Sequence, residues 1–223
     1  MDAEYRQADS EANLVEQVRA QVRHFFEDAR GSHGWDHTRR VCRLCEQIGA
    51  AEQADMTVLR IAALLHDIGR ADQDRANGEI CHARQGAKRA VPLLRPLDLS
   101  AERKENILHC IRCHRFRGEN VPETPEAKVL FDADKLDGIG AVGVARAYLF
   151  AGEIGARLHS SGVPPEETAP YSREDTGYRE FRVKLCGVKD RMLTPTGRKM
   201  AEDRHAFMTA FFDRFLAEYE GRL

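Results

Sequence analysis

The sequence predicts an all-α protein, with roughly seven to nine helices packed as a bundle in a single domain over residues 1–223. Apolar residues recur at three- and four-residue spacings through most long segments, which is the helical period. The chain has no series of alternating strand-like runs, no internal repeat and no Gly-rich phosphate loop. Hydrophobic residues make up 42% and charged residues 31%, as in ordinary globular proteins.

Apolar stripes, and the residues that interrupt them, define the helices of the first third of the chain. The first stripe includes Leu14, Val18 and Val22, and a segment with two glycines follows it. Gly69 is a suitable stop for the third helix, because glycine readily ends helices. The predicted helices here cover residues 9–29, 36–49 and 55–68.

The middle of the chain continues the helical pattern after a polar stretch over residues 70–79. Pro96 interrupts the fourth helix, and Ser100 is a good N-cap for the fifth. A loop with two prolines precedes the sixth helix. The predicted helices of this region cover residues 82–94, 101–116 and 125–150.

Residues 157–177 are rich in Pro, Ser and Gly, and we interpret them as a long mobile loop, because loops of this length in compact domains are often lids or insertions. The chain then ends in one amphipathic helix over residues 196–220, with Met200, Phe207 and Phe211 among its apolar positions.

The charge balance argues against bulk attraction to a polyanion. Lys plus Arg number 34 against 36 Asp plus Glu, so the net charge is −2. We therefore expect neither a nucleic-acid polymer nor an anionic membrane as partner. The N-terminus has no signal pattern and no apolar run approaches the roughly 20 residues that span a bilayer, so we expect a cytoplasmic protein.

Six cysteines are then expected to stay reduced. Cys42 and Cys45, and likewise Cys110 and Cys113, form C-x-x-C pairs, and two such pairs can make a structural zinc site. Neither pair is followed by the Gly-bearing turn of a zinc knuckle, and both lie in stretches of helical period. We therefore favour buried packing over zinc binding.

Four polar residues occupy positions where a core-facing helix normally carries Leu or Ala. His37 precedes Val41 at i+4, and His66 follows Ala62 by the same spacing, so both imidazoles face the interior. Asp67 follows His66 directly, and Asp134 lies within the segment FDADKLDGIGAVG. Taken singly, each would be read as a hydrogen-bonded core residue or a cap.

Together the four residues predict a cation site. Burying two carboxylates without partners costs several kcal/mol, which a divalent cation would offset. Two imidazoles and two carboxylates form a mixed N/O set that suits Mn²⁺, Fe²⁺, Co²⁺, Ni²⁺ or Zn²⁺ better than Mg²⁺. Mn²⁺ is the cation we expect. A six-coordinate ion would keep two positions open for water and a phosphoryl oxygen.

The order His37, His66-Asp67 in LLHDIG, and Asp134 in DADKLD resembles the HD-domain metal-dependent phosphohydrolase superfamily. The flanking segments SHGWDHTRRV and DADKLDGIGAVGVAR are similar to a bacterial branch that includes nucleotide pyrophosphohydrolases. The resemblance covers residues 30–221 and implies an HD-domain helical bundle. Gly34 and Lys135 depart from the branch, which has Asp and Arg there, but neither belongs to the metal set.

The resemblance also implies roles for the site residues. The metal ligands would be His37, His66, Asp67 and Asp134, with Asp67 also orienting the attacking water. His82 and His114 would contact phosphate or donate a proton, or else hold a second metal, and Lys135 would stabilise developing charge. The residues expected to contact substrate are His33, Arg40, Arg70 and Lys135.

The expected function is hydrolysis of a small phosphorylated substrate, most specifically of a nucleoside triphosphate to a monophosphate and diphosphate. Two alternatives stay open: a phosphodiesterase or phosphomonoesterase for another small molecule, and a metal-binding interaction module without catalysis. Diphosphate release would distinguish the first reading from the others. The protein is expected to be a monomer or a homodimer.

Overall fold

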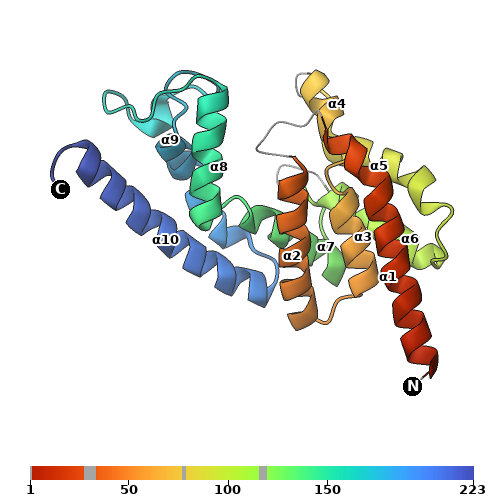
Figure 1. The fold of residues 1–223 in the computed structure, drawn as a ribbon. Coiled ribbons are helices and arrows are strands. Elements are labelled where there is room, and N and C mark those ends of the chain that lie inside the picture. Colours follow the sequence, from red (N-terminus) through yellow and green to blue (C-terminus); the bar gives the residue numbers. More distant parts are fainter. Residues whose placement is uncertain (1, 28–33, 77–78, 116–119) are drawn as a thin grey trace. The chain divides into compact units, whose positions relative to one another are not determined.

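The computed structural model describes residues 2–27, 34–76, 79–115 and 120–223, which group into two compact units, Met1–Asp134 and Lys135–Leu223 (Figure 1). Within these ranges the regular structure consists of helices, with no strand, which confirms the predicted all-α class. The organisation of residues 1–223 as one domain stays a prediction. Among the described residues, no helix is long and apolar enough to cross a membrane.

The first unit is built around α3. This helix is apolar almost throughout, and Leu59, Ile61 and Leu65 are fully buried, because other helices cover it on several sides. It packs against α1, α2, α5 and α6. The helices of this unit are α1 (Asp2–Val22), η1 (Arg23–Phe26), α2 (Trp35–Ala51), α3 (Met56–Leu65), α4 (Arg70–Arg75), α5 (His82–Leu94), α6 (Ala101–Cys113) and α7 (Pro125–Leu136), which reaches two residues past the unit boundary.

A polar network at the start of α3 fixes its position. Asp55 caps the helix by accepting from the backbone N–H groups of Thr57 and Val58. Its second carboxylate oxygen accepts from Arg103 Nε at 2.7 Å, and the same arginine donates to Glu11 at 2.9 Å. Side chains of α1 and α6 are thereby tied to one end of α3.

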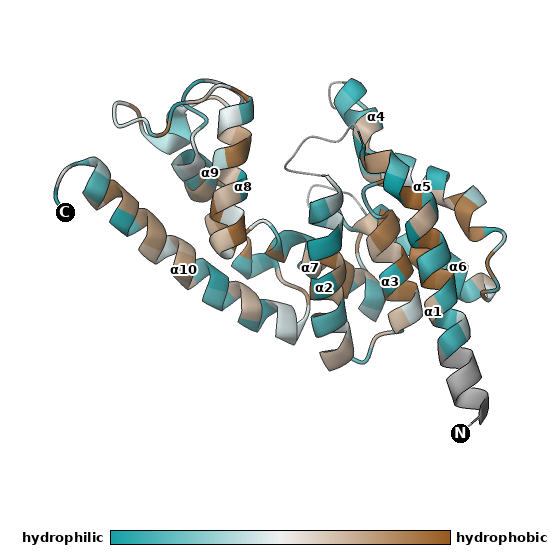
Figure 2. Cartoon of the chain, in the orientation of Figure 1, coloured by the Kyte–Doolittle hydropathy of each residue, from teal (hydrophilic) through white to brown (hydrophobic). Residues whose placement is uncertain are grey.

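The second unit contains α8 (Gly140–Glu153), η3 (Pro165–Glu167), α9 (Gly177–Val183), η4 (Leu185–Gly187), η5 (Lys189–Arg191) and α10 (Pro195–Tyr219). Phe212 of α10 is buried and stacks on Phe181 of α9, with ring centroids 4.6 Å apart. Hydrophilic and hydrophobic residues are interspersed along α10, as expected of an amphipathic helix (Figure 2). α10 agrees with the predicted helix 196–220 within one residue at each end.

The prediction of one helix over residues 125–150 is wrong. The chain turns between α7 and α8, and Gly140 adopts φ +77°, a left-handed conformation that glycine tolerates. Asp137, in this turn, accepts from Arg146 of α8 at 2.8 Å. The apolar period continues through the turn, which explains why the sequence pattern concealed it.

Other helix ends also differ from the predictions. The first α-helix ends at Val22 and continues as a 3₁₀ turn to Phe26, and the last residues of the predicted 9–29 segment lie outside the described ranges. The third helix ends at Leu65, and the fifth at Cys113. The polar stretch 70–79 contains α4, which the sequence analysis missed because its six residues, five of them polar, show no apolar stripe.

Two further predictions concern the 157–177 segment and the cysteines. This segment contains η3, and Arg179 donates to Thr168 O and Oγ1, so hydrogen bonds hold it to α9. Its mobility stays a prediction.

Cys45, Cys110 and Cys113 are buried, and burial raises the pKa of each of these thiols.

Candidate metal centre

Three of the four predicted ligands converge directly. His37 comes from the first turns of α2, His66 from the residue that ends α3, and Asp134 from α7. The Nε2 atoms of His37 and His66 lie 3.3 Å apart, and His37 Nε2 lies 3.3 Å from Asp134 Oδ1. Both histidines are buried. These residues form the first cluster, whose ligand atoms lie close enough to hold one metal ion.

Asp67 lies in the turn between α3 and α4 and faces two groups of histidines. Its Oδ2 atom lies 3.8 Å from His37 Nε2 and 3.9 Å from His66 Nε2. Its Oδ1 atom lies 3.5 Å from His82 Nε2 and 3.6 Å from His114 Nε2. The two oxygens of one buried carboxylate are thus directed at different imidazole pairs.

His82 at the start of α5 and His114 at the end of α6 form a second cluster with Asp67. Their Nε2 atoms lie 3.1 Å apart, and both side chains are buried. His66 also lies next to His114, with ring centroids 5.1 Å apart. The two clusters are therefore continuous through Asp67 and this pair of rings.

Three of the four histidines are fixed in one tautomer by their other ring nitrogen. Nδ1 of His66 lies 2.8 Å from Ala63 O, and Nδ1 of His114 lies 2.7 Å from Ile111 O. A carbonyl oxygen can only accept, so each Nδ1 carries the proton and each Nε2 presents a lone pair. His82 Nδ1 is held likewise, 2.8 Å from Gln73 Oε1.

The distances between these lone pairs fit a shared cation. Two neutral imidazoles, such as those of His82 and His114, that face each other at 3.1 Å through unprotonated nitrogens repel. Two nitrogen ligands at about 2.1 Å from one ion, at angles near 90–110°, are about 3.0–3.4 Å apart. The donor set, neutral nitrogens with carboxylate oxygens, is the one that divalent transition metals prefer. The residues present therefore fit a divalent cation.

The electrostatics of the centre keep its ligands in their metal-binding forms. Burial lowers the pKa of His66 to about 4 and that of His82 to about 2. Burial opposes ionisation of Asp67, but the Arg70 guanidinium and the neighbouring imidazoles hold the pKa of this carboxyl well below its ordinary value. Arg70 Nε lies 3.7 Å from Asp67 Oδ2. The imidazoles of His66 and His82 are therefore neutral, and the Asp67 carboxylate is charged, near neutral pH.

We expect the metal-free protein to lose stability as the pH falls from 6.5 towards 4. An unfolded histidine takes up a proton near its ordinary pKa of 6.5, whereas folded His66 does so only near 4. Protons therefore favour unfolding in this window, by about 1 kcal/mol per pH unit for each of His66 and His82. Urea unfolding in EDTA at pH 7, 6 and 5 measures the slope.

The matched variant is His82→Asn, which removes one of the two groups. It should reduce the dependence of the unfolding free energy on pH by about 1 kcal/mol per pH unit. Equal stability of the wild-type protein at pH 6.5 and 5 would contradict the neutral, buried state of these imidazoles.

Gln73 of α4 is a positioning residue that the sequence analysis did not identify. Its Oε1 atom accepts from both the backbone N–H and Nδ1 of His82, at 3.3 and 2.8 Å. Such partners fix the orientation and tautomer of ligating histidines. Gln73 lies in a stretch without apolar period, so only its spacing before His82 could have drawn attention to it.

We expect Gln73→Leu to weaken metal binding or turnover about 10- to 100-fold, because His82 loses the acceptor of its Nδ1 proton. Titration of Mn²⁺ into the metal-free protein, together with initial rates, measures both effects. Gln47→Leu, at an exposed position of α2, is the matched control and should change neither. If the Gln73→Leu protein had unaltered metal affinity and rate, Gln73 would have no functional role in positioning His82.

The remaining predicted site residues are placed as follows. Arg70 lies beside Asp67, and its Nη1 atom lies 3.4 Å from His82 Nδ1. Arg40 is half-buried on α2, one turn after His37, and Lys135 directly follows Asp134 on α7. His33 lies outside the described residues.

The described residues thus form an all-α protein with buried histidines and carboxylates that could hold a divalent cation. Comparison with known proteins specifies the class. The family model of the HD domain matches residues 34–139. YpgQ of Bacillus subtilis (strain 168) is 34% identical over 205 residues, which cover 90% of this chain and 91% of YpgQ.

Solved structures agree with this match. The crystal structure of an HD-superfamily hydrolase from Bacillus thuringiensis has a TM-score of 0.75 at 28% identity, covering 94% of this chain and 98% of that one. The crystal structure of Bacillus subtilis YpgQ in complex with ADP has a TM-score of 0.70 at 31% identity, covering 94% and 96%. The chain belongs to the HD-domain superfamily and is a metal-dependent phosphohydrolase.

Proposed function

We propose that the protein hydrolyses nucleoside triphosphates to monophosphates and diphosphate, using a cation held by His37, His66, Asp67 and Asp134. The observation that carries the metal assignment is the approach of two buried Nε2 atoms to 3.3 Å, with carboxylate oxygens of Asp67 and Asp134 beside them. Mn²⁺ is the cation we propose, because the mixed N/O set suits it better than Mg²⁺.

A cation at this position would make a bound water more acidic and polarise a phosphoryl oxygen. The chain's own residues hold that water and the substrate. Asp67 is the group we propose to orient the water and take up its proton, because its carboxylate lies beside the Nε2 atoms of His37 and His66. His37 and His66, held by their helices, would fix the position of the cation and thereby that of the phosphoryl group.

The second cluster favours a second cation. His82 and His114 approach each other through Nε2 as closely as the first pair does, and Asp67 Oδ1 faces both of these atoms at 3.5 and 3.6 Å. We therefore propose that Asp67 is shared between two cations. Binding of a single equivalent of metal would instead return His82 and His114 to the role of proton donors to the leaving phosphate.

Nucleotide specificity is supported by a relative and by the cationic residues around the centre. The structure of YpgQ in complex with ADP makes a nucleotide the first substrate to test here. Arg70 contributes a guanidinium at the centre itself, and we propose Arg40, Lys135 and His33 as further contacts to phosphate. The alternative is a phosphodiester or phosphomonoester of another small molecule.

A product assay tests the proposal. The protein is incubated with Mn²⁺ and a panel of nucleoside tri-, di- and monophosphates and phosphodiesters. Phosphate, diphosphate and cleaved diester are detected separately. We expect diphosphate from triphosphates, with none in EDTA. Phosphate without diphosphate would support the monoesterase alternative, and cleavage confined to diesters would support the phosphodiesterase. Size measurement in the same buffer distinguishes a monomer from a homodimer, the two expected states.

A further inference from the structure

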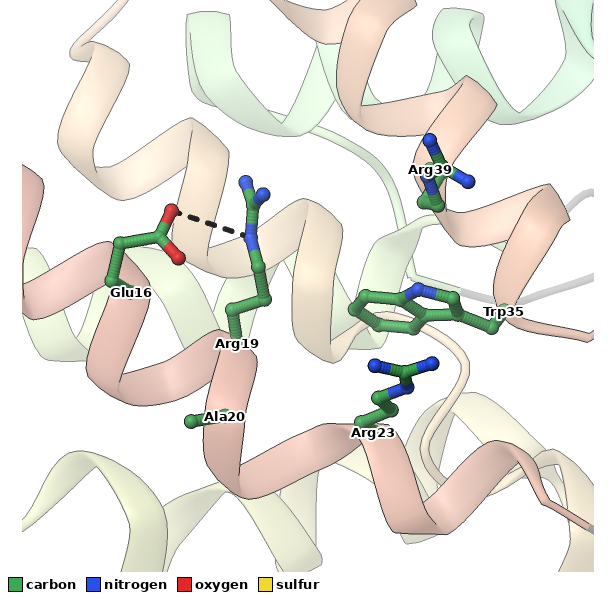
Figure 3. Close-up of a pocket in the computed structure, with 6 residues that line it drawn as sticks. All are labelled: Glu16, Arg19, Ala20, Arg23, Trp35 and Arg39. Atoms are coloured by element: carbon green, nitrogen blue, oxygen red, sulfur yellow. Dashed lines mark ion pairs between the residues drawn. The ribbon is translucent and has the colours of Figure 1, made fainter.

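A pocket lies in the first unit, between the C-terminal half of α1, η1 and the first turns of α2 (Figure 3). Its volume is about 290 Å³, close to the lower limit of small-molecule sites. Three arginines and one glutamate line it, so its lining carries a net positive charge. The six lining residues are Glu16, Arg19, Ala20, Arg23, Trp35 and Arg39.

The pocket and the metal centre lie on different faces of α2. Trp35 and Arg39 are four residues apart and share one face, which contributes to the pocket. His37 follows Trp35 by two residues, about 200° around the helix, and is buried among the metal-centre residues. A ligand in the pocket would therefore be separate from one at the metal centre.

The arginines of the pocket are only weakly neutralised. Glu16 lies 3.5 Å from Arg19, and both side chains are about half exposed or more. Such surface pairs contribute little. Arg23 makes no ion pair with a described residue, and it follows Arg19 by four positions, where like charges repel. Arg39 Nη1 lies 3.6 Å from Asp36 Oδ1, and both of these side chains are exposed. An anion bound here would relieve this repulsion.

Trp35 supplies a flat surface beside the arginines. Its ring packs against the buried Phe26, with ring centroids 5.6 Å apart, and this contact restrains the orientation of the indole. In the view of Figure 3, the indole lies between the guanidinium groups of Arg23 and Arg39. An indole stacks on nucleobases, and guanidinium groups bind phosphates through paired N–H donors.

We propose that this pocket binds a nucleoside polyphosphate as a second ligand, with the base against Trp35 and the phosphates on Arg19, Arg23 and Arg39. The net charge of the chain is −2, so the chain as a whole does not attract a nucleic-acid strand. The three lining arginines lie in one small pocket, which favours a free nucleotide as the ligand. The site goes beyond the proposed function, in which a nucleotide is cleaved at the metal centre.

Trp35 is the single tryptophan of the chain, so its fluorescence reports on the pocket directly. The experiment titrates ATP into the protein in EDTA, using both the wild-type chain and Asp67→Ala, which disables the metal centre. We expect a saturable change of Trp35 emission in both. The double variant Arg19→Gln/Arg23→Gln should bind ATP at least tenfold more weakly. Arg214→Gln, at an exposed position of α10, is the matched control and should bind as the wild type does.

The proposal is overturned if ATP causes no saturable change in the wild-type chain in EDTA, or if Arg19→Gln/Arg23→Gln binds within twofold of the wild type. Tighter binding of a ten-nucleotide single strand than of ATP would also overturn it, by identifying nucleic acid as the occupant. The fluorescence change requires neither metal nor turnover, so these outcomes do not test the proposed hydrolysis. A protein that fails to hydrolyse nucleotides could likewise still bind ATP in this pocket.

Discussion

Replacing Asp67 with Ala should lower the rate of metal-dependent hydrolysis by at least about 10³-fold while leaving the helical content unchanged. The carboxylate faces both imidazole pairs, with its two oxygens 3.5–3.9 Å from four Nε2 atoms. Removing it takes a carboxylate away from both imidazole pairs and leaves the Arg70 guanidinium at the centre without its carboxylate partner. Initial rates at saturating Mn²⁺, with circular dichroism on the same samples, measure both quantities.

The control for this change is Asp213→Ala, at an exposed position of α10 in the second unit. It removes the same chemical group without touching the centre, and its rate should equal that of the wild type. Turnover of Asp67→Ala within tenfold of the wild type, in folded protein, would show that this carboxylate is not part of the catalytic site.

Replacing Gly69 with Ala should both destabilise the protein and reduce its activity. A Cβ atom at this position would lie 2.4 Å from the backbone oxygen of His82 and 2.6 Å from the backbone nitrogen of Gly86. Both contacts are with the backbone of α5, so no flexible side chain can move away. We expect a loss of about 1–3 kcal/mol in the free energy of unfolding.

The activity should fall together with the stability. Gly69 lies in the same turn as Asp67, and its lack of a side chain lets this turn lie close to the start of α5, where His82 is located. A displacement of about 1 Å between catalytic groups can cost about 100-fold in rate. Urea unfolding and initial rates measured at a temperature where the variant is folded separate the two effects.

Gly152→Ala is the matched control, with the opposite sign expected. This glycine lies in α8, and no atom lies within 4 Å of its added Cβ. Because alanine favours helices over glycine, the protein should gain up to about 1 kcal/mol of stability without a change in rate. Equal behaviour of Gly69→Ala and Gly152→Ala would show that the close approach of Gly69 to α5 does not matter.

The sequence was sufficient to predict the metal-centre candidates because they interrupt a regular pattern. His37, His66 and Asp134 stand at apolar positions of helices, so the helical period alone directs them to the interior, where the structure brings them together. The α-helical class and the bounds of α5 and α10 follow from the same period. Their ligand roles stay a prediction.

The contacts between elements could not be derived in this way. Gln73 lies on a short polar helix with no apolar stripe, and its hydrogen bonds to His82 depend on how α4 packs against α5. The break between α7 and α8 depends on the left-handed conformation of Gly140, which an uninterrupted apolar pattern does not reveal. The cationic pocket combines residues from α1, η1 and α2, which no local pattern relates.

The most direct test of the metal centre is an anomalous difference map from crystals of the Mn²⁺-loaded, active protein, recorded on both sides of the manganese absorption edge. We predict a manganese peak about 2.0–2.3 Å from Nε2 of His37 and His66 and from carboxylate oxygens of Asp67 and Asp134. A further peak between His82, His114 and Asp67 would identify the second cation. Active crystals whose manganese peak lies away from the first four residues, or that have none, would contradict the assignment.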